Sequence, residues 1–91
     1  MYLHLGRDVV VRLSDVVAIL DMETATVGPL TRDFLKQAER ELRVTTITDD
    51  IPKSFVLTVE GGTERVYLSQ IAPATLEKRV ESGGLVTDAL V

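Results

Sequence analysis

The chain has 91 residues, of which 45% are hydrophobic and 4% aromatic, so there is material for one small core and too little for a second domain. It has no cysteine and a single histidine, which excludes disulfide bonds, thiolate metal sites and a tetrahedral zinc site built from one chain. The formal net charge of −4 also differs from the basic balance that is usual in an autonomous nucleic-acid-binding domain.

The first half of the chain predicts three strands. Residues 2–5 and 9–12 are rich in strand-forming side chains and flank Gly6-Arg7-Asp8, which indicates a hairpin with a tight turn. Residues 16–20 form a nearly continuous apolar run that is too short for a good helix. We therefore expect residues 16–20 to form a buried strand at the centre of the sheet.

The clearest predicted element is a helix over about 29–43. Residues 21–27 read as a polar connection, and Gly28-Pro29 marks the start of the helix, because proline is tolerated at the first helical position. An apolar stripe follows at helical spacing, and it consists of Leu30, Phe34, Leu35, Ala38 and Leu42.

A second hairpin is predicted further along the chain. A short strand over 45–48 and a loop over 49–52 come first, since aspartate favours turns and Pro52 lacks a backbone donor. Residues 54–60 and 63–68 then read as two strands around Gly61-Gly62.

The last predicted element is a short helix over about 72–82. Pro73 lies near its first turn, Gly83-Gly84 ends it, and apolar residues recur every four positions, at Ala72, Leu76 and Val80. Residues 83–91 read as a flexible C-terminal tail. The sequence thus predicts a single α+β domain over 1–82, in which a small antiparallel or mixed sheet of hairpins packs with one main and one short helix.

A chain this short buries little apolar surface, and disulfide bonds and a thiolate metal site are excluded as further sources of stability. Contact with other copies of the chain remains, so we expect a homo-oligomer. No stretch approaches the ~18 apolar residues that a membrane span needs, and residues 1–8 lack the basic-then-apolar order of a signal peptide. We therefore expect a cytoplasmic protein with no membrane contact.

No residue pattern in the sequence predicts catalysis or a cofactor. His4 has no cysteine or acidic cluster at ligand spacing, and we interpret it as a half-exposed strand residue. Asp49 and Asp50 are adjacent in a loop, where their carboxylates diverge, so a turn is the better interpretation. Gly61-Gly62 lacks the lysine and the following helix of a phosphate-binding loop. None of the serines stands in a nucleophile motif, namely Ser14, Ser54, Ser69 and Ser82.

One charged pattern stands out on the main predicted helix. Cations spaced four, four and three residues apart fall along a single helix face, at Arg32, Lys36, Arg40 and Arg43. An ordinary solvated face is one interpretation, because Asp33 and Glu39 stand at pairing distance. The other is a contact with phosphates or with an acidic partner, which repetition around a ring would multiply.

Several stretches together resemble the bacterial extracellular matrix regulatory family, in particular its RemB-like branch. They cover roughly residues 1–80 in the same order and spacing, and they are residues 2–6, 8–11, 17–21, 52–56, 66–71, 74–76 and 78–79. The resemblance implies a small non-enzymatic regulator of genes for the biofilm matrix. It also implies assembly into closed rings that bind DNA, as in the RemA branch of that family.

The chain departs from the RemA pattern at two places. The arginine-rich loop of that branch is replaced here by Asp49-Asp50-Ile51-Pro52-Lys53, and an arginine near the third strand is replaced by Ser14-Asp15. One hypothesis is therefore a ring-forming regulator that contacts promoter DNA weakly through phosphates, with the candidate cations Arg32, Lys36, Arg40, Arg43 and Lys53. The alternative is an acidic homo-oligomeric scaffold that acts through a protein partner, such as a DNA-binding paralogue.

Overall fold

The structure is a computed structural model that describes residues 1–25 and 27–82. Its elements follow one another as β1 (Tyr2–Gly6), β2 (Val9–Arg12), a 3-10 turn (Leu13–Asp15), β3 (Val16–Asp21), α1 (Met22–Ala25), α2 (Pro29–Arg40), β4 (Val44–Thr46), β5 (Ser54–Glu60), β6 (Thr63–Ser69) and α3 (Pro73–Glu81). The α+β class, both hairpins and the short C-terminal helix are confirmed. The predicted tail at 83–91 lies outside the described residues.

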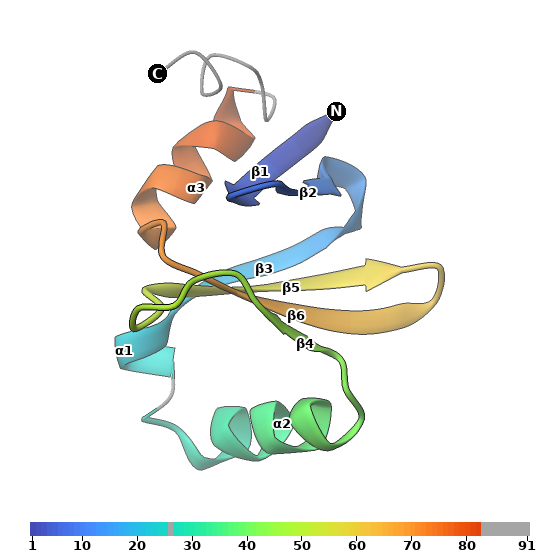
Figure 1. The fold of residues 1–91 in the computed structure, drawn as a ribbon, viewed down its shortest axis with the longest axis vertical. Helices are drawn as coiled ribbons and strands as arrows, with labels where there is room; N and C mark the ends of the chain where they lie inside the picture. Colours follow the sequence, from blue (N-terminus) through green and yellow to red (C-terminus); the bar gives the residue numbers. More distant parts are fainter. Residues whose placement is uncertain (26, 83–91) are drawn as a thin grey trace.

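The elements form three layers (Figure 1). A four-stranded sheet in the order β3-β5-β6-β4 lies in the middle, and α2 packs below it. The β1–β2 hairpin and α3 lie together above it. The sheet is mixed, because β4 runs parallel to β6 while β3, β5 and β6 pair antiparallel. Both faces of the sheet are therefore covered.

Strand β5 shows how two cores arise from one strand. Successive side chains point to opposite faces, so Phe55 faces α2 and Val56 faces the hairpin and α3. Phe55 is 2% exposed and packs with Ala38 of α2 and Val66 of β6. Val56 belongs to a second, larger cluster that contains Leu3, Leu5, Val11, Ile47, Tyr67 and Leu76. A strand that is buried on both faces has a nearly continuous apolar sequence, so apolar and polar residues alternate only weakly at the start of β5.

Buried hydroxyl groups fasten the upper layer to the sheet. The Ser69 hydroxyl donates to the carbonyl oxygen of Leu5 at 2.6 Å, and the Ser54 hydroxyl donates to that of Ile71 at 2.9 Å. Both serines are fully buried, so each hydroxyl needs a partner in place of water. These two bonds hold β1 and the approach to α3 against the paired ends of β5 and β6.

The predicted central position of the strand at 16–20 is wrong. This strand, β3, lies at the edge of the sheet and pairs there with β5. None of its residues is buried, and Val17 is 58% exposed. The β5–β6 hairpin takes the centre instead, since a continuous apolar run indicates a strand without indicating its place in a sheet.

The main helix is shorter than the predicted 29–43, because α2 ends at Arg40. Leu42 adopts a left-handed conformation with φ +58°, and the amides of Leu42 and Arg43 donate to the carbonyl groups of Glu39 and Ala38. This bonding is a Schellman motif, which normally places glycine where Leu42 stands. Leu42 is 87% exposed and Leu30 is 84% exposed, so neither belongs to the buried stripe of α2.

The segment predicted as a polar connection contains a helical turn, α1. Asp21 starts this turn, because its Oδ1 accepts a hydrogen bond from the amide of Glu23 at 2.8 Å. The predicted strand at 45–48 begins one residue earlier and ends at Thr46 as β4.

Candidate nucleic-acid interface

Three of the five candidate cations form a row on the outer face of α2. Arg32, Lys36 and Arg40 are exposed, while Phe34, Leu35 and Ala38 on the opposite side pack against the sheet. Residues four apart in a helix are surface neighbours with Cβ atoms about 6 Å apart, so the three side chains follow one another along the helix. We call them the α2 cation row.

No member of the α2 cation row forms an ion pair with another described residue. The pairing with Asp33 and Glu39 that would make the row an ordinary salt-bridged face is therefore not observed. Three cationic side chains are available on this face to an external anion.

Arg43 does not belong to the row, although its spacing predicted that it would. The Schellman turn carries it past the end of α2, where its Nε lies 2.8 Å from Glu41 Oε1. Its Nη1 donates to the backbone oxygen of Glu64 at 3.1 Å, and the guanidinium lies 5.9 Å from the ring centroid of Phe34. The side chain is 14% exposed, so Arg43 fastens the end of α2 to β6 and is not free for a ligand.

The same contacts act on the carboxyl of Glu41. Hydrogen bonds from Gln37 and then from Arg43 hold the pKa of Glu41 below its usual value. Glu41 thus stays ionised and keeps its partner in place at ordinary pH.

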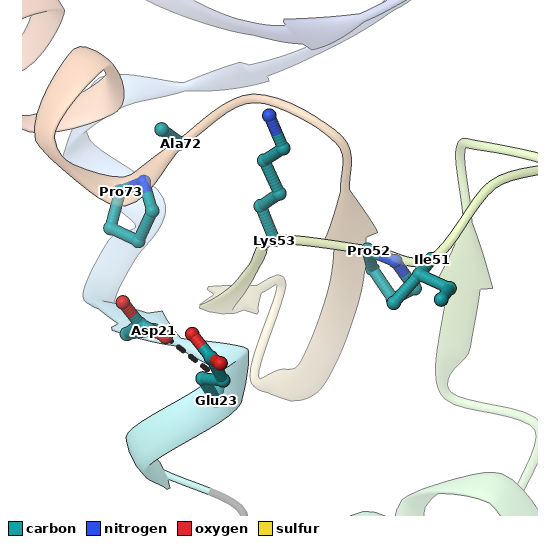
Figure 2. A pocket seen from close by; sticks show the side chains of 7 residues that line it. All are labelled: Asp21, Glu23, Ile51, Pro52, Lys53, Ala72 and Pro73. Carbon is teal, nitrogen blue, oxygen red and sulfur yellow. Dashed lines mark hydrogen bonds between the residues drawn. The ribbon is translucent and has the colours of Figure 1, made fainter.

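Lys53 lies away from α2, at the start of β5 beside a surface hollow of about 450 Å³ (Figure 2). Its backbone is fixed on both sides, because its amide donates to Ser69 at 2.8 Å and its carbonyl accepts from Met22 at 3.0 Å. Figure 2 shows its side chain pointing toward the segment before α3, away from the carboxylates of Asp21 and Glu23. The structure therefore does not unite Lys53 with the α2 cation row.

The loop before β5 displays carboxylates in a fixed arrangement. The amide of Asp50 donates to Thr48 Oγ1 at 3.0 Å, and Gln70 Nε2 donates to Asp50 Oδ2 at 3.1 Å. Arg7 Nη2 donates to Asp49 Oδ2 at 2.8 Å, although the Asp49 side chain is 91% exposed. The loop is thus tied both to the first hairpin and to the end of β6, with its negative charge at the surface.

A polar network on the sheet was not anticipated from the sequence. Tyr67 Oη and Thr58 Oγ1 both donate to Glu60 Oε2, at 2.6 and 2.7 Å, and Arg65 Nε lies 3.8 Å from Glu60 Oε1. Burial, followed by the hydrogen bond to Glu60, raises the pKa of Tyr67 to about 12. Burial alone raises the pKa of Glu60, but the bonds from Tyr67 and Thr58 outweigh it and lower that pKa. In the sequence, only the two-residue spacing of Thr58 and Glu60, which places them on one strand face, indicated a possible contact. That spacing indicated neither Tyr67 as the second donor to Glu60 nor the burial of Tyr67.

The described residues contain no group of three or more histidine, cysteine, aspartate or glutamate side chains arranged to hold a metal ion. The imidazole of His4 donates from Nε2 to the carbonyl oxygen of Arg7 at 2.6 Å, which places it in the first hairpin turn. Among residues 1–25 and 27–82, no helix has both the length and the apolar character that crossing a membrane requires.

Comparison with known proteins gives two matches over most of the chain. Residues 2–80 match the RemA-like family, described as extracellular matrix regulatory protein A-like. The chain is also 37% identical over 81 residues to extracellular matrix regulatory protein B of Bacillus subtilis (strain 168), which covers 89% of this chain and 91% of that protein.

Proposed function

This chain belongs to the RemA-like family of extracellular matrix regulatory proteins, and we propose that it regulates matrix and biofilm gene expression without catalysis, by contacting DNA phosphates through its α2 cation row. The observation that carries the proposal is the exposure of Arg32, Lys36 and Arg40 without ion-pair partners among the described residues. The site of action in this proposal is the cytoplasm.

Phosphate contacts explain how a chain of net charge −4 can bind DNA at all. Cations that neutralise phosphates release condensed counterions, and this gain depends on the local row and not on the total charge. The contacts carry no sequence information by themselves, because they position a protein on the duplex without reading base edges. One subunit with three such cations is expected to bind weakly and to lose affinity steeply as salt rises.

Assembly into a ring raises this weak affinity in the proposed mechanism. Several α2 cation rows on one rigid particle meet the same DNA, so that each contact after the first is intramolecular. The exposed apolar side chains of the described residues supply material for contacts between subunits, and they include Tyr2, Val10, Val17 and Val59. Arg43 and Lys53 are left out of the proposed interface, because Arg43 is held by Glu41 and Glu64 and Lys53 lies elsewhere.

Electrophoretic mobility shifts on matrix-gene promoter DNA, at low and at moderate salt, test the proposal. The triple variant Arg32→Gln, Lys36→Gln, Arg40→Gln should lose the shift that the wild type gives at low salt. Lys78→Gln is the matched control, since Lys78 is an exposed helix cation on the other side of the sheet. Light scattering on each sample ensures that equal assemblies are compared. No wild-type shift at low salt, or equal shifts for wild type and triple variant, would refute the proposal.

The fixed acidic loop favours a second candidate, a scaffold that acts through a basic protein partner such as a DNA-binding paralogue. The Asp49 and Asp50 carboxylates are displayed where the resemblance implies arginines, and Arg7 and Gln70 hold them in place. Like charge at a DNA-facing loop opposes phosphate, whereas it complements a basic protein surface. If the chain is such a scaffold, a DNA-binding paralogue should co-elute with the wild type, and less of it should co-elute with the double variant Asp49→Asn, Asp50→Asn. A paralogue that co-elutes with neither protein would count against the scaffold.

A further inference from the structure

The outer edge of β3 is open among the described residues. Strand β3 pairs with β5 on one side, and no strand within residues 1–25 and 27–82 pairs with its other side. An open edge presents unpaired backbone N–H and C=O groups, to which another extended segment can bond. The six residues of β3 include no lysine, proline or glycine, the residues that weaken or block pairing at a sheet edge. Apart from a register shift between Val16 and Ala18, the pairing with β5 is regular. Strand β3 is therefore a template for one more strand.

A groove flanks this edge on each face of the sheet, because α3 and α2 lie on opposite faces (Figure 1). The upper groove, about 370 Å³, separates β3 from α3, and it is lined by residues 16–19, Glu77, Val80 and Glu81. The lower groove, about 220 Å³, lies toward α2, and it is lined by Leu20, Leu30, Thr31, Phe34, Phe55 and Leu57. Successive side chains of a strand point to opposite faces of a sheet. A strand added to β3 would therefore place its side chains alternately in the upper and the lower groove.

The two grooves differ in charge. No charged side chain lines the lower groove, where Leu30 is 84% exposed. The upper groove has an apolar floor, but Glu77 and Glu81 stand along it, four residues apart on one face of α3. Neither carboxylate forms an ion pair with another described residue, and no described cation lines either groove. Arg79 of the same helix donates instead to the backbone oxygen of His4 on β1. An occupant of this edge thus meets apolar surface on one face and two carboxylates on the other.

We propose that the β3 edge binds an extended segment of a basic partner protein, in which apolar residues alternate with lysine or arginine. The segment adds a fifth strand to the sheet, so that backbone hydrogen bonds hold it and the grooves select its side chains. Its apolar side chains enter the lower groove and cover Leu30. Its basic side chains lie in the upper groove, where their aliphatic stems cover Val80 and their charged ends meet Glu77 and Glu81. The six residues of β3 give this surface a length of about 20 Å.

Charge favours this partner over a second copy of the chain. Two β3 edges that pair antiparallel about a twofold axis would bring both α3 helices to the same face of the joined sheet. Glu77 and Glu81 of each copy would then lie near the same carboxylates of the other, and like charges oppose association. Strand β3 itself offers no cation, since its one charged residue is Asp21. The inference does not depend on the proposed DNA contact, and it leaves Tyr2 and Val10 exposed for the proposed contacts between subunits.

Fluorescence anisotropy of a labelled peptide, titrated with the full chain, tests the proposal. The probe is a short peptide in which lysine and valine alternate, and it should bind with a Kd of about 1 mM or lower. Two control peptides should bind at least about tenfold more weakly. One alternates glutamate with valine and so carries the wrong charge. The other is the lysine–valine peptide with every backbone amide methylated, which removes the donors that a strand needs.

Variants of the chain then locate the binding site. The double variant Glu77→Gln, Glu81→Gln should raise the Kd of the lysine–valine peptide about threefold or more, because two exposed ion pairs are lost. Glu39→Gln is the matched control, since Glu39 is an exposed helix carboxylate on α2, and it should leave the Kd unchanged. With the peptide at about ten times its Kd, the β3 amides that do not donate to β5 should exchange their hydrogen about tenfold more slowly.

Four results would overturn the proposal. The first is no binding of the lysine–valine peptide at about 1 mM protein. The second is binding of either control peptide as tight as that of the lysine–valine peptide. The third is an unchanged Kd in the double variant, or protection from exchange that arises elsewhere than at β3. The fourth is a mass by light scattering that falls as the peptide is added, which would assign the edge to a second copy.

Discussion

Replacing Tyr67 by phenylalanine should destabilise the protein in a way that depends on pH. The substitution removes the hydroxyl that donates to Glu60 Oε2 at 2.6 Å and leaves the ring in the upper core. Thr58 and Arg65 keep their contacts with Glu60, so the carboxylate is not left without partners. The loss therefore reports the hydroxyl itself.

The raised pKa of Tyr67 sets both the sign and the size of the effect. Its value is about 12 in the fold against an ordinary 10.0, mainly because burial disfavours the phenolate and because Glu60 holds the proton. Two units correspond to about 2.7 kcal/mol as an upper bound, and screening at the partly exposed Glu60 carboxylate reduces this to about 1–2 kcal/mol. Below pH 10 both folded and unfolded chains keep the proton, so the contribution is complete. From pH 10 to 12 the unfolded chain loses its proton first, and the contribution disappears.

Urea unfolding of wild type and Tyr67→Phe at a series of pH values between about 8 and 12 measures this contribution. Subtracting the two free energies cancels every pH-dependent contribution that the two proteins share. The difference should be largest below pH 10 and should shrink toward zero as the pH approaches 12. A difference that stays constant over this range, or no difference at pH 8, would refute the reasoning.

Four further substitutions follow from packing and backbone geometry. Phe55→Ala should lower the free energy of unfolding by about 3–5 kcal/mol, because Phe55 is buried between the sheet and α2. Leu20→Ala should lower it by a smaller amount, because Leu20 is only half-buried on the edge strand β3. Equal urea midpoints for the two variants would contradict the layer arrangement. Leu42→Gly should raise thermal stability by about 0.5–1 kcal/mol, since it removes left-handed strain at an exposed residue, and a lower melting temperature would count against the Schellman turn. Gly6→Ala should cost about 1–3 kcal/mol in urea unfolding, because φ is +128° and the new Cβ would lie 3.2 Å from Ile47 Cγ2, whereas unchanged stability would be inconsistent with that contact.

Local signals predicted the elements of this fold well. Glycine turns marked both hairpins, because glycine permits the positive φ angles of tight turns. Pro29 and Pro73 marked the starts of α2 and α3, because proline fixes φ near the helical value. The order of strands in the sheet could not be predicted in this way. Residues 16–20 have the composition of a central strand, but their edge position follows from the long-range pairing of β5 with β6.

The candidate site was predictable only as far as the helix continued. Arg32, Lys36 and Arg40 keep the spacing that the sequence indicated, since they lie within α2. Arg43 does not keep this spacing, because α2 ends at Arg40. The guanidinium of Arg43 instead contacts Glu64, which is 21 residues away in sequence. The acidic loop was recognised from composition, but its attachment through Arg7 and Gln70 depends on contacts that no local pattern reveals.

The salt dependence of DNA binding tests the central claim most directly. Fluorescence anisotropy at several salt concentrations gives the slope of log K against log salt for wild type, Lys36→Gln and Lys78→Gln. Each phosphate contact contributes about 0.9 to the magnitude of this slope on duplex DNA. If the α2 cation row contacts phosphates, Lys36→Gln should lower the magnitude by at least about 0.9 and Lys78→Gln should leave it unchanged. The same slope for all three proteins would contradict the account.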